Sequence, residues 1–257
     1  MTGTNVNKIA VGIDIGSRMT KIVTVSGLEM VDARIFPTGH DPLERLKEAA
    51  PVFAGRNVIA TGYGRRLVQS LIPCGVVTEI KACARAARYL YPDAESVIDI
   101  GGQDSKAIEL NGRGFGRFEM NDRCAAGTGC FLEVMAKTLG YSIEEFGTAA
   151  MQVDLPARIN SMCTVFAESE VVSLIARGED RRRIAYGLHL AVARRIAAMA
   201  SRIMTGKCMV FVGGVANNPC MVSALSEEIG FPLTVPDRPE YAVALGAALI
   251  GLEENVK

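Results

Sequence analysis

Two apolar runs in the chain are each interrupted by one aspartate and followed by glycine. Ile9–Ile15 reads IAVGIDI, and Val97–Ile100 repeats its ending as VIDI. In both copies a glycine turn and a second run with β-branched residues follow, which is the pattern of a β-hairpin. Ile13–Lys21 and Ile98–Lys106 agree at six of nine positions, with Ser and Thr counted as equal, at an offset of 85 residues. A repeat at this spacing predicts two similar halves that face each other.

The second copy continues into a segment that carries a cysteine. After its returning strand and a short polar turn comes FEMNDRCAAGTGCFLEVMAKTL. The first part of this segment predicts a third strand, and the rest predicts a helix with Cys124 at its start. A glycine turn suited to phosphate and a candidate metal ligand therefore lie about 20 residues apart on one continuous element. We expect the two to be coupled.

Capping residues and helical periodicity place the other elements. Asp41 and Pro42 begin a helix, because Asp is a favourable N-cap and Pro suits the first helical position. Ser142 and Glu145 form a capping box before another helix. The remaining predicted elements are the strands Asn57–Thr61, Cys208–Val212 and Leu233–Val235 and the helices Thr78–Tyr91, Val165–Gly178, Glu179–Met204, a helix opened by Asn218 and Pro219, and Tyr241–Leu252.

Strands that alternate with helices predict an α/β protein. The repeat divides it into two halves, each a mixed sheet with helices. Residues 1–95 together with the C-terminal helix at 239–257 are expected to form the first half, and residues 96–238 the second half, which carries the cysteine segments.

Charge and hydropathy exclude several classes of protein. Lys plus Arg and Asp plus Glu number 28 each, which argues against a nucleic-acid or polybasic membrane partner. The N-terminal MTGTNVNK has no apolar signal core, and no run approaches 18 apolar residues. We expect a soluble cytoplasmic protein.

The chain contains seven cysteines. An odd number in a cytoplasmic chain makes a disulfide framework improbable, and the absence of a CxxC pair excludes a zinc ribbon. Most are expected to be small buried residues. A metal cluster would have to collect ligands from distant segments or from more than one chain.

Each Asp-x-Gly hairpin can bring backbone N–H groups close to phosphate oxygens. The candidates in the first copy are Asp14, Gly16, Ser17 and Lys21. A buried carboxylate needs a partner to offset its desolvation, and Mg²⁺ would supply one for Asp14 and for its counterpart Asp99. The alternative is an ordinary hairpin turn capped by Asp, which is much less probable for two matched copies.

Two further glycine loops complete the set. Gly101 and Gly102 form the turn of the second hairpin. Gly213, Gly214 and Asn217 follow a predicted strand and precede an Asn-Pro helix start, which suits close approach of a nucleotide's base, ribose or α-phosphate. Such a turn alone is common in α/β proteins; here it is the third of a set.

The motifs VIDIGGQD, NDRCAAGTG and SMCTVFAESEV resemble the BadF/BadG/BcrA/BcrD ATPase family of 2-hydroxyacyl-CoA dehydratase activators and benzoyl-CoA reductase ATPase subunits. The order DIG, GGQD, GGVAxN is similar to that of the wider actin/Hsp70/sugar-kinase superfamily. The resemblance covers nearly all of Ile9–Gly251. It implies duplicated ribonuclease H-like domains with ATP and Mg²⁺ in the cleft between them, and an oxygen-sensitive homodimer that holds one [4Fe-4S] cluster between its subunits.

The resemblance assigns the cluster to Cys124 and Cys163. A [4Fe-4S] cluster takes four thiolates, so two from each chain require a two-fold dimer. Both cysteines lie at predicted helix N-termini, where the helix dipole and free N–H groups favour the thiolate and can bond to cluster sulfides. Cys130, six residues along the same predicted helix, would point about 240° away and is interpreted as non-ligating.

Gln103 and Asp104 are the candidate catalytic residues. Gln103 could orient the water that attacks the γ-phosphate, as a glutamine does in GTPases; the alternative is an amide that only stabilises the turn. Asp104 has no counterpart in the first copy, where Met19 stands. His189 lies among Leu and Ala in a helix and is expected to be structural.

By the resemblance, ATP hydrolysis drives single electrons from a ferredoxin or flavodoxin to an acyl-CoA dehydratase or reductase component in anaerobic metabolism. Within the family, a homodimeric dehydratase activator and a subunit of a heteromeric reductase both stay open. Two rivals from other classes are an acyl or sugar kinase of the same superfamily and a non-catalytic actin- or chaperone-like protein. A kinase needs a catalytic carboxylate near the γ-phosphate, where Gln103 stands, and the non-catalytic protein should lack the paired cysteine motifs.

Overall fold

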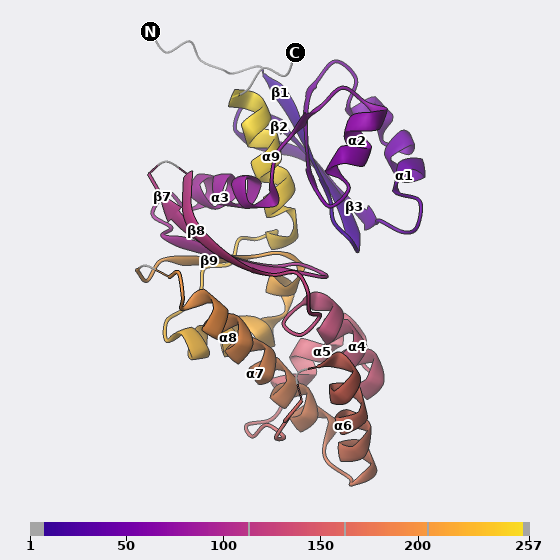
Figure 1. The fold of residues 1–257 in the computed structure, drawn as a ribbon, viewed down its shortest axis with the longest axis vertical. Helices are drawn as coiled ribbons and strands as arrows, with labels where there is room; N and C mark the ends of the chain where they lie inside the picture. The colour runs from indigo at the N-terminus through magenta and orange to yellow at the C-terminus, as the bar shows by residue number, and fades with distance from the viewer. Residues whose placement is uncertain (1–7, 113, 162, 205, 254–257) are drawn as a thin grey trace. The chain divides into compact units, whose positions relative to one another are not determined.

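A computed structural model describes residues 8–112, 114–161, 163–204 and 206–253, and these form two compact units (Figure 1). Unit 1 consists of the described residues of 1–94, 110–115 and 241–257, and unit 2 of those of 95–109 and 116–240. The predictions made for residues 1–7, for Met162 and for residues 254–257 lie outside the described residues.

Unit 1 is built on a mixed sheet with strand order β3-β2-β1-β4-β5. The hairpin of the first repeat copy is antiparallel, and β4 runs parallel to β1 on its other side. The strands are β1 (Ile9–Ile15), β2 (Met19–Ser26), β3 (Glu29–Pro37), β4 (Asn57–Gly62) and β5 (Gly75–Val76). The helices are α1 (Pro42–Glu48), η1 (Ala50–Val52), α2 (Arg65–Leu71), α3 (Glu79–Leu90) and α9 (Ala242–Glu253).

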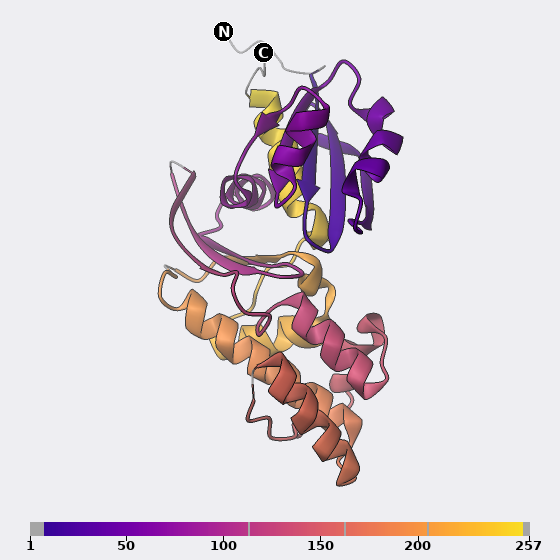
Figure 2. The same cartoon turned by 45° about the vertical axis from the view of Figure 1, so that its right-hand side comes forward.

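The C-terminal helix α9 fills the interior of unit 1. Ala242–Leu252 is buried throughout, because α9 packs against β1, β2 and β4 on one side and α3 on another. Both views show it in yellow beside the indigo sheet (Figures 1 and 2). A helix that is apolar on every face is stable only when it is enclosed in this way. The final helix predicted from sequence is therefore confirmed.

Unit 2 repeats the plan with strand order β8-β7-β6-β9, in which β6 and β7 form the second hairpin and β9 runs parallel to β6. Helices gather on one face of this sheet and share its core (Figure 2). The strands are β6 (Ser96–Ile100), β7 (Ser105–Asn111), β8 (Gly114–Asn121) and β9 (Met209–Val212). The helices are α4 (Gly129–Leu139), α5 (Ile143–Ala150), α6 (Thr164–Ala176), α7 (Arg181–Ala200), η2 (Gly214–Asn217) and α8 (Pro219–Ile229), with η3 (Pro239–Tyr241) before α9.

The predicted caps are present where helices begin. Asp41 Oδ1 accepts the Leu43 N–H at 3.0 Å. Ser142 and Glu145 form the full capping box, in which each side chain accepts the other residue's backbone N–H. Because these side chains satisfy helix N–H groups that lack an internal partner, they fix where α1 and α5 start.

Several predictions about elements need correction. The helix expected to start at Cys124 begins at Gly129. The expected strand Leu233–Val235 is reduced to a single bridge between Val210 and Thr234, because prolines at 232 and 236 lack the N–H groups that would extend the ladder. Strands β3 and β5 and helix α2 were not predicted. Of the described helices, none is long and apolar enough to cross a membrane.

Candidate functional site

In unit 1 the first hairpin brings a carboxylate, a lysine and a tight turn together. Asp14 on β1 stands opposite Lys21 on β2, and Lys21 Nζ lies 3.3 Å from Asp14 Oδ2. Asp14 is 6% exposed. The Gly16 N–H donates to the Met19 carbonyl at 3.2 Å and closes the turn that contains Ser17. The predicted residues Asp14, Gly16, Ser17 and Lys21 are therefore neighbours.

Two threonines that were not predicted as site residues hold this turn. Thr38 Oγ1 donates to the Gly16 carbonyl at 2.8 Å and is hydrogen-bonded to Thr20 Oγ1 at 3.0 Å. Both threonines are buried. Thr38 lies just beyond β3, which was itself not predicted, so no local pattern could place it beside Gly16.

In unit 2 the second hairpin repeats this arrangement with an added carboxylate. Asp99 stands opposite Lys106, and Lys106 Nζ lies 3.6 Å from Asp99 Oδ2 and 2.8 Å from Asp104 Oδ1. The Gly101 N–H donates to the Asp104 carbonyl at 2.9 Å. Because all three charged side chains are almost fully buried, the lysine offsets the desolvation of two carboxylates.

This geometry corrects part of the reasoning for magnesium. We expected Mg²⁺ to supply the partner that a buried Asp14 or Asp99 needs, but Lys21 and Lys106 already supply one. Within the described residues, no group of three or more His, Cys, Asp or Glu side chains is arranged to hold a metal ion. Burial of the aspartates alone therefore does not indicate a metal.

The same kind of glycine lies at the end of the parallel neighbour strand in both units. Gly62 is the last residue of β4 and Gly213 follows β9, with φ of 85° and 89°, a conformation that favours glycine. A Cβ at Gly213 would lie against the Ile100 carbonyl and 2.5 Å from Asp99 Oδ1, and a Cβ at Gly62 would lie against the Ile15 carbonyl. Gly62 was missed as a site residue. Aligning the ends of β4 and β9 as part of the repeat would have revealed it.

The third predicted loop follows Gly213. The Gly213 N–H donates to the Pro239 carbonyl at 3.0 Å, and Gly214 begins η2. Asn217 Nδ2 donates to Glu240 Oε2 at 3.0 Å, so its side chain orients Glu240 in this structure. Gly101, Asp99 and Gly213 therefore come together, whereas the Asn217 side chain is directed to Glu240.

Asn218 joins this loop to a buried histidine. His189 on α7 is fully buried, with Nδ1 2.7 Å from the Ala185 carbonyl and Nε2 3.0 Å from Asn218 Nδ2. Asn218 Oδ1 in turn accepts the Met221 N–H at 3.1 Å and caps α8. Burial lowers the pKa of His189 to about 4. The structural role predicted for His189 agrees with these contacts.

The start of α4 is bonded directly to the turn of the second hairpin. The Gly129 N–H donates to the Gly101 carbonyl at 2.9 Å, and the Cys130 N–H donates to the Gly102 carbonyl at 2.8 Å. Helix-start N–H groups have no partner within the helix, so they are available for such bonds. Two backbone hydrogen bonds thus join the glycine turn to the helix that follows Cys124, and the coupling between the two sites stays a prediction.

Cys124 lies in the loop before α4 and not at the helix N-terminus. Thr128 is the N-cap, its Oγ1 donates to the Ala125 carbonyl at 2.7 Å, and Gly127 has φ of 89°. These features form a turn that delays the helix by five residues. The prediction that Cys130 points about 240° from Cys124 was therefore wrong in its basis, since only Cys130 is helical. Asn121 Nδ2 donates to the Cys124 carbonyl at 2.9 Å and holds the loop.

Cys163 is the N-cap residue of α6, as predicted. Cys124 and Cys163 are the two exposed cysteines of the seven. Cys74, Cys83 and Cys220 are buried, and burial raises the pKa of the Cys220 thiol to about 12. Cys130 and Cys208 are half-buried, so the interior position predicted for Cys208 is only partly reached. The helices that follow the two exposed cysteines, α4 and α6, pack against each other.

The remaining residues singled out from the sequence are a glutamine in the second turn and two glutamates on α6. Gln103 is exposed in the turn of the second hairpin. Glu168 on α6 is exposed, while Glu170 is half-buried and accepts hydrogen bonds from Asn160 and Ser161. Desolvation raises the pKa of Glu170, but these hydrogen bonds outweigh it and leave the pKa below its usual range.

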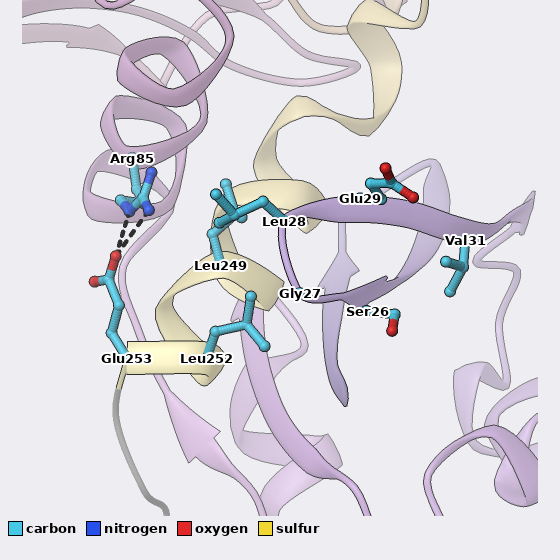
Figure 3. A pocket seen from close by; sticks show the side chains of 9 residues that line it. All are labelled: Ser26, Gly27, Leu28, Glu29, Val31, Arg85, Leu249, Leu252 and Glu253. Carbon is cyan, nitrogen blue, oxygen red and sulfur yellow. Dashed lines mark hydrogen bonds and ion pairs between the residues drawn. The ribbon is translucent and has the colours of Figure 1, made fainter. Parts of the chain in front are cut away.

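A separate cavity of about 580 Å³ lies in unit 1 (Figure 3). Leu249 and Leu252 of α9 point toward it, and the ion pair of Arg85 and Glu253 stands at one side. None of the residues selected from the sequence lines this cavity. It adjoins the turn between β2 and β3 and is distinct from the two glycine turns that follow β1 and β6.

A family model matches residues 11–251, nearly the whole chain. The chain belongs to the BadF/BadG/BcrA/BcrD ATPase family. The prediction of an ATPase in this family is confirmed.

Similar proteins include two dehydratase activators and one subunit of a benzoyl-CoA reductase. The 2-hydroxyisocaproyl-CoA dehydratase activator of Clostridioides difficile is 37% identical over 95% of this chain and 94% of its own length. The (R)-2-hydroxyglutaryl-CoA dehydratase activating ATPase of Acidaminococcus fermentans is 35% identical over 96% and 98%. A benzoyl-CoA reductase component of Thauera aromatica is 34% identical over 78% and 72%.

Solved structures with similar folds confirm the fold class. Component A of (R)-2-hydroxyglutaryl-CoA dehydratase from Acidaminococcus fermentans superposes with a TM-score of 0.91 at 34% identity, covering 98% of this chain and 100% of its own. A ROK family glucokinase from Streptomyces griseus matches with a TM-score of 0.61 at 13% identity, covering 96% of this chain and 100% of its own, which shows the fold alone. The predicted duplicated fold of the actin/Hsp70/sugar-kinase superfamily is thus confirmed.

Proposed function

We propose that this protein is an ATP-dependent one-electron transferase that activates an acyl-CoA dehydratase or a benzoyl-CoA reductase-type partner. In this proposal two copies of the chain hold one [4Fe-4S] cluster through Cys124 and Cys163. The observation that carries it is the exposure of these two cysteines, while the other five are buried or half-buried. Family membership supplies the ATPase, and the relatives' activator functions support the partner class.

The cysteines of this chain fit such a cluster. When bound, a [4Fe-4S] cluster accepts and donates single electrons through iron held by four thiolates. One chain offers two exposed thiols, which matches half of that requirement. Cys163 N-caps α6, so N–H groups of the first helical turn lie close to it. Exposure also leaves both thiols accessible to a second chain.

The proposed contacts with the nucleotide come from the glycine turns of both units. In unit 1 they are Gly16, Ser17 and Lys21, and in unit 2 they are Gly101, Gly102, Gly213, Gly214 and Asn217. The N–H groups of Gly16 and Gly101 close their own turns, so these two glycines would allow close approach of the backbone, and N–H bonds to phosphate would come from the turn residues that follow. The relative from Clostridium difficile was solved with bound ADPNP, which supports ATP as the nucleotide.

Two buried hydroxyl groups suit a hydrated Mg²⁺ that accompanies ATP. Thr61 stands beside Asp14 in the register of β1 and β4, and its Oγ1 has no hydrogen-bond partner in the described part of the chain. Ser105 Oγ, next to Asp104 in the chain, likewise has no hydrogen-bond partner among the described residues. Mg²⁺ usually keeps several water ligands, and such waters would satisfy these groups. Asp14 and Asp99 are the proposed carboxylates.

Gln103 is proposed to orient the water that attacks the γ-phosphate, because it is exposed in the turn where phosphate would lie. Asp104 has a different task, since Lys106 Nζ lies 2.8 Å from its carboxylate. We propose that Asp104 supports hydrolysis by fixing Lys106 and the turn. The bonds from the Gly129 and Cys130 N–H groups to Gly101 and Gly102 would pass any movement of this turn to α4 and the Cys124 loop.

Oxygen-free purification with iron and sulfide analysis tests the redox part of the proposal. The wild type is expected to be brown, with about four irons per dimer. Cys124→Ser and Cys163→Ser should each lose the colour. Cys130→Ser, whose thiol is half-buried and six positions from Cys124, serves as the matched control and should retain it. A colourless, iron-free wild type that turns over ATP would refute electron transfer and leave a kinase as the better interpretation.

The magnesium assignment has its own test. Asp14→Asn and Asp99→Asn are expected to reduce Mg²⁺-dependent ATP turnover while leaving the iron content unchanged, because the hairpins that carry them hold neither of the proposed cluster thiols. Steady-state hydrolysis over a range of Mg²⁺ concentrations gives the readout. Full activity of both variants would remove these carboxylates from the metal site.

A further inference from the structure

The described residues of the segment that leads to Cys163 have no regular structure of their own. Between the turn after α5 and the start of α6, the described residues 153–161 form neither helix nor strand. Loops of this length keep a fixed path only when side chains or neighbouring backbone anchor them. Near its start, the Ala157 N–H donates to the Arg183 carbonyl at 2.8 Å, and Arg183 Nε donates to the Leu155 carbonyl at 3.1 Å. These anchors lie six or more residues before Cys163.

In the part of the chain that the structure describes, the anchor nearest to Cys163 in this segment is a carboxylate on α6. Glu170 Oε2 accepts the Ser161 N–H at 2.8 Å, and Oε1 accepts the Asn160 N–H at 3.0 Å and Asn160 Nδ2 at 2.7 Å. Glu170 lies seven residues, or about two helical turns, beyond the N-cap Cys163. Its side chain therefore ties the incoming segment of chain back onto the helix that the cysteine begins.

This contact requires a carboxylate. Both oxygens accept, and the donors come from two consecutive backbone N–H groups and one side-chain amide. A glutamine of the same size has one accepting oxygen and an NH₂ group that would face an N–H donor. Hydrogen bonds to a charged acceptor are also stronger than those to a neutral one. The anchor is thus sensitive to replacement of one oxygen by nitrogen.

Among the described residues, Cys163 has few other contacts that fix it. Its side chain is exposed, and its thiol makes no capping hydrogen bond to the helix. An exposed residue is not held by core packing, so its position depends on the backbone on either side. On the C-terminal side that backbone is α6, whose Ala167 N–H donates to the Cys163 carbonyl at 2.8 Å. On the N-terminal side it is the Asn160–Ser161 segment that Glu170 holds.

We propose that Glu170 is a positioning residue for the Cys163 ligand: it holds the chain before Cys163 so that the thiolate reaches the iron–sulfur cluster in one fixed place. This inference rests on the proposed cluster. Glu170 acts through backbone groups and touches no reacting atom. Metal ligands bind most tightly when neighbouring groups orient them in advance, and loss of such support commonly weakens metal affinity about 10- to 100-fold.

Glu168 provides a matched control on the same helix. It lies two residues before Glu170, is exposed, and carries the same charge. Glu168→Gln therefore removes one negative charge from α6 without removing the anchor. Glu170→Gln removes the same charge and, in addition, one of the two accepting oxygens of the anchor, at almost unchanged volume. The difference between the two variants isolates the hydrogen bonds from the charge.

The experiment uses the oxygen-free full-length dimer and three measurements. Iron per dimer, the electron paramagnetic resonance spectrum of the reduced cluster, and the rate of iron loss to a ferrous chelator are compared for wild type, Glu170→Gln and Glu168→Gln. Glu170→Gln is expected to lose iron about tenfold faster than wild type and to show an altered spectrum. Glu168→Gln should stay within about twofold of wild type, with its spectrum unchanged.

The outcomes separate this inference from the proposed function. If the wild type binds no iron, the cluster proposal fails and the inference falls with it. If the wild type binds iron and Glu170→Gln matches Glu168→Gln in spectrum and iron loss, the cluster stands and the positioning role is refuted. A Glu170→Gln protein that unfolds at lower urea concentration but keeps the wild-type spectrum and chelator rate also refutes it, since that is the result of a purely structural role.

Discussion

Acid should destabilise this protein through one buried histidine. His189 is completely enclosed, and burial lowers its pKa to about 4 from an ordinary 6.5. The Ala185 carbonyl can only accept a hydrogen bond, so the proton of the neutral ring is on Nδ1. Nε2 is then unprotonated and accepts a hydrogen bond from Asn218 Nδ2. A proton on Nε2 would face the Asn218 NH₂ group and disturb the residue that caps α8. The folded protein therefore keeps His189 neutral to a lower pH than the unfolded chain does.

The direction and the size of the change in stability follow from the difference in His189 pKa between the folded and the unfolded chain. As pH falls below 6.5 the unfolded chain takes up the proton first, so protonation favours unfolding until the folded form also titrates near pH 4. At about 1.36 kcal/mol for each pH unit, the loss is about 2 kcal/mol at pH 5 and about 3 kcal/mol near pH 4. Against a typical stability of about 5–15 kcal/mol, this is a large fraction.

Urea denaturation from pH 7 to pH 4 measures the effect in wild type and in His189→Gln. Glutamine can place its amide oxygen where Nε2 accepts from Asn218, and it does not titrate. Both chains should carry Cys124→Ser and Cys163→Ser, so that an acid-labile cluster does not contribute. Other groups, such as Asp180, whose pKa a hydrogen bond from Arg182 lowers to about 2, affect both chains equally. Parallel stability curves for the two proteins across this pH range would refute the reasoning.

Three further perturbations follow from the contacts around the hairpins and caps. Gly213→Ala should weaken ATP binding at least about tenfold by calorimetry, because the new Cβ would press on the Ile100 carbonyl and the Asp99 carboxylate. Gly112→Ala, outside the proposed site and with nothing within 4 Å of the new Cβ, should bind ATP normally, and equal affinities for the two variants would contradict this. Lys106→Met removes the lysine that is paired with two buried carboxylates and should lower the free energy of unfolding in urea by about 3–5 kcal/mol. Acid conditions should reduce this loss, and an unchanged urea midpoint would count against the ion pairs. Ser142→Ala removes half of a capping box and should lower the free energy of thermal unfolding by about 1 kcal/mol. A loss below about 0.3 kcal/mol would show that Glu145 alone is enough to cap α5.

Features that depend on residues close together in the chain could be predicted from the sequence. The repeat of Ile13–Lys21 in Ile98–Lys106 correctly indicated two hairpins, because the alternation of apolar residues and the glycine turn act locally. Caps at Asp41 and Ser142 were predictable for the same reason. The site residues drawn from the repeat also came together within each unit.

Other features depend on contacts between distant residues. Thr38 reaches Gly16 from 22 positions away, and Gly62 resembles Gly213 only once β4 and β9 are seen as equivalent strands. The true start of α4 depends on a turn around Gly127 that competes with the helix. The lysines were visible in the repeat, but their pairing with the buried aspartates removed the reason for requiring a metal there.

The joint between α4 and the glycine turn is built from peptide groups alone. Replacing the Cys130 side chain leaves these donors and acceptors in place, whereas an alanine at Gly129 would put its Cβ 3.1 Å from the Gly101 carbonyl oxygen that accepts one of the two bonds. If a change at the nucleotide reaches α4 through this joint, substitutions of the exposed side chains nearby would leave that connection intact. A change in the course of the main chain, such as an inserted residue between the turn and the helix, would disconnect the two.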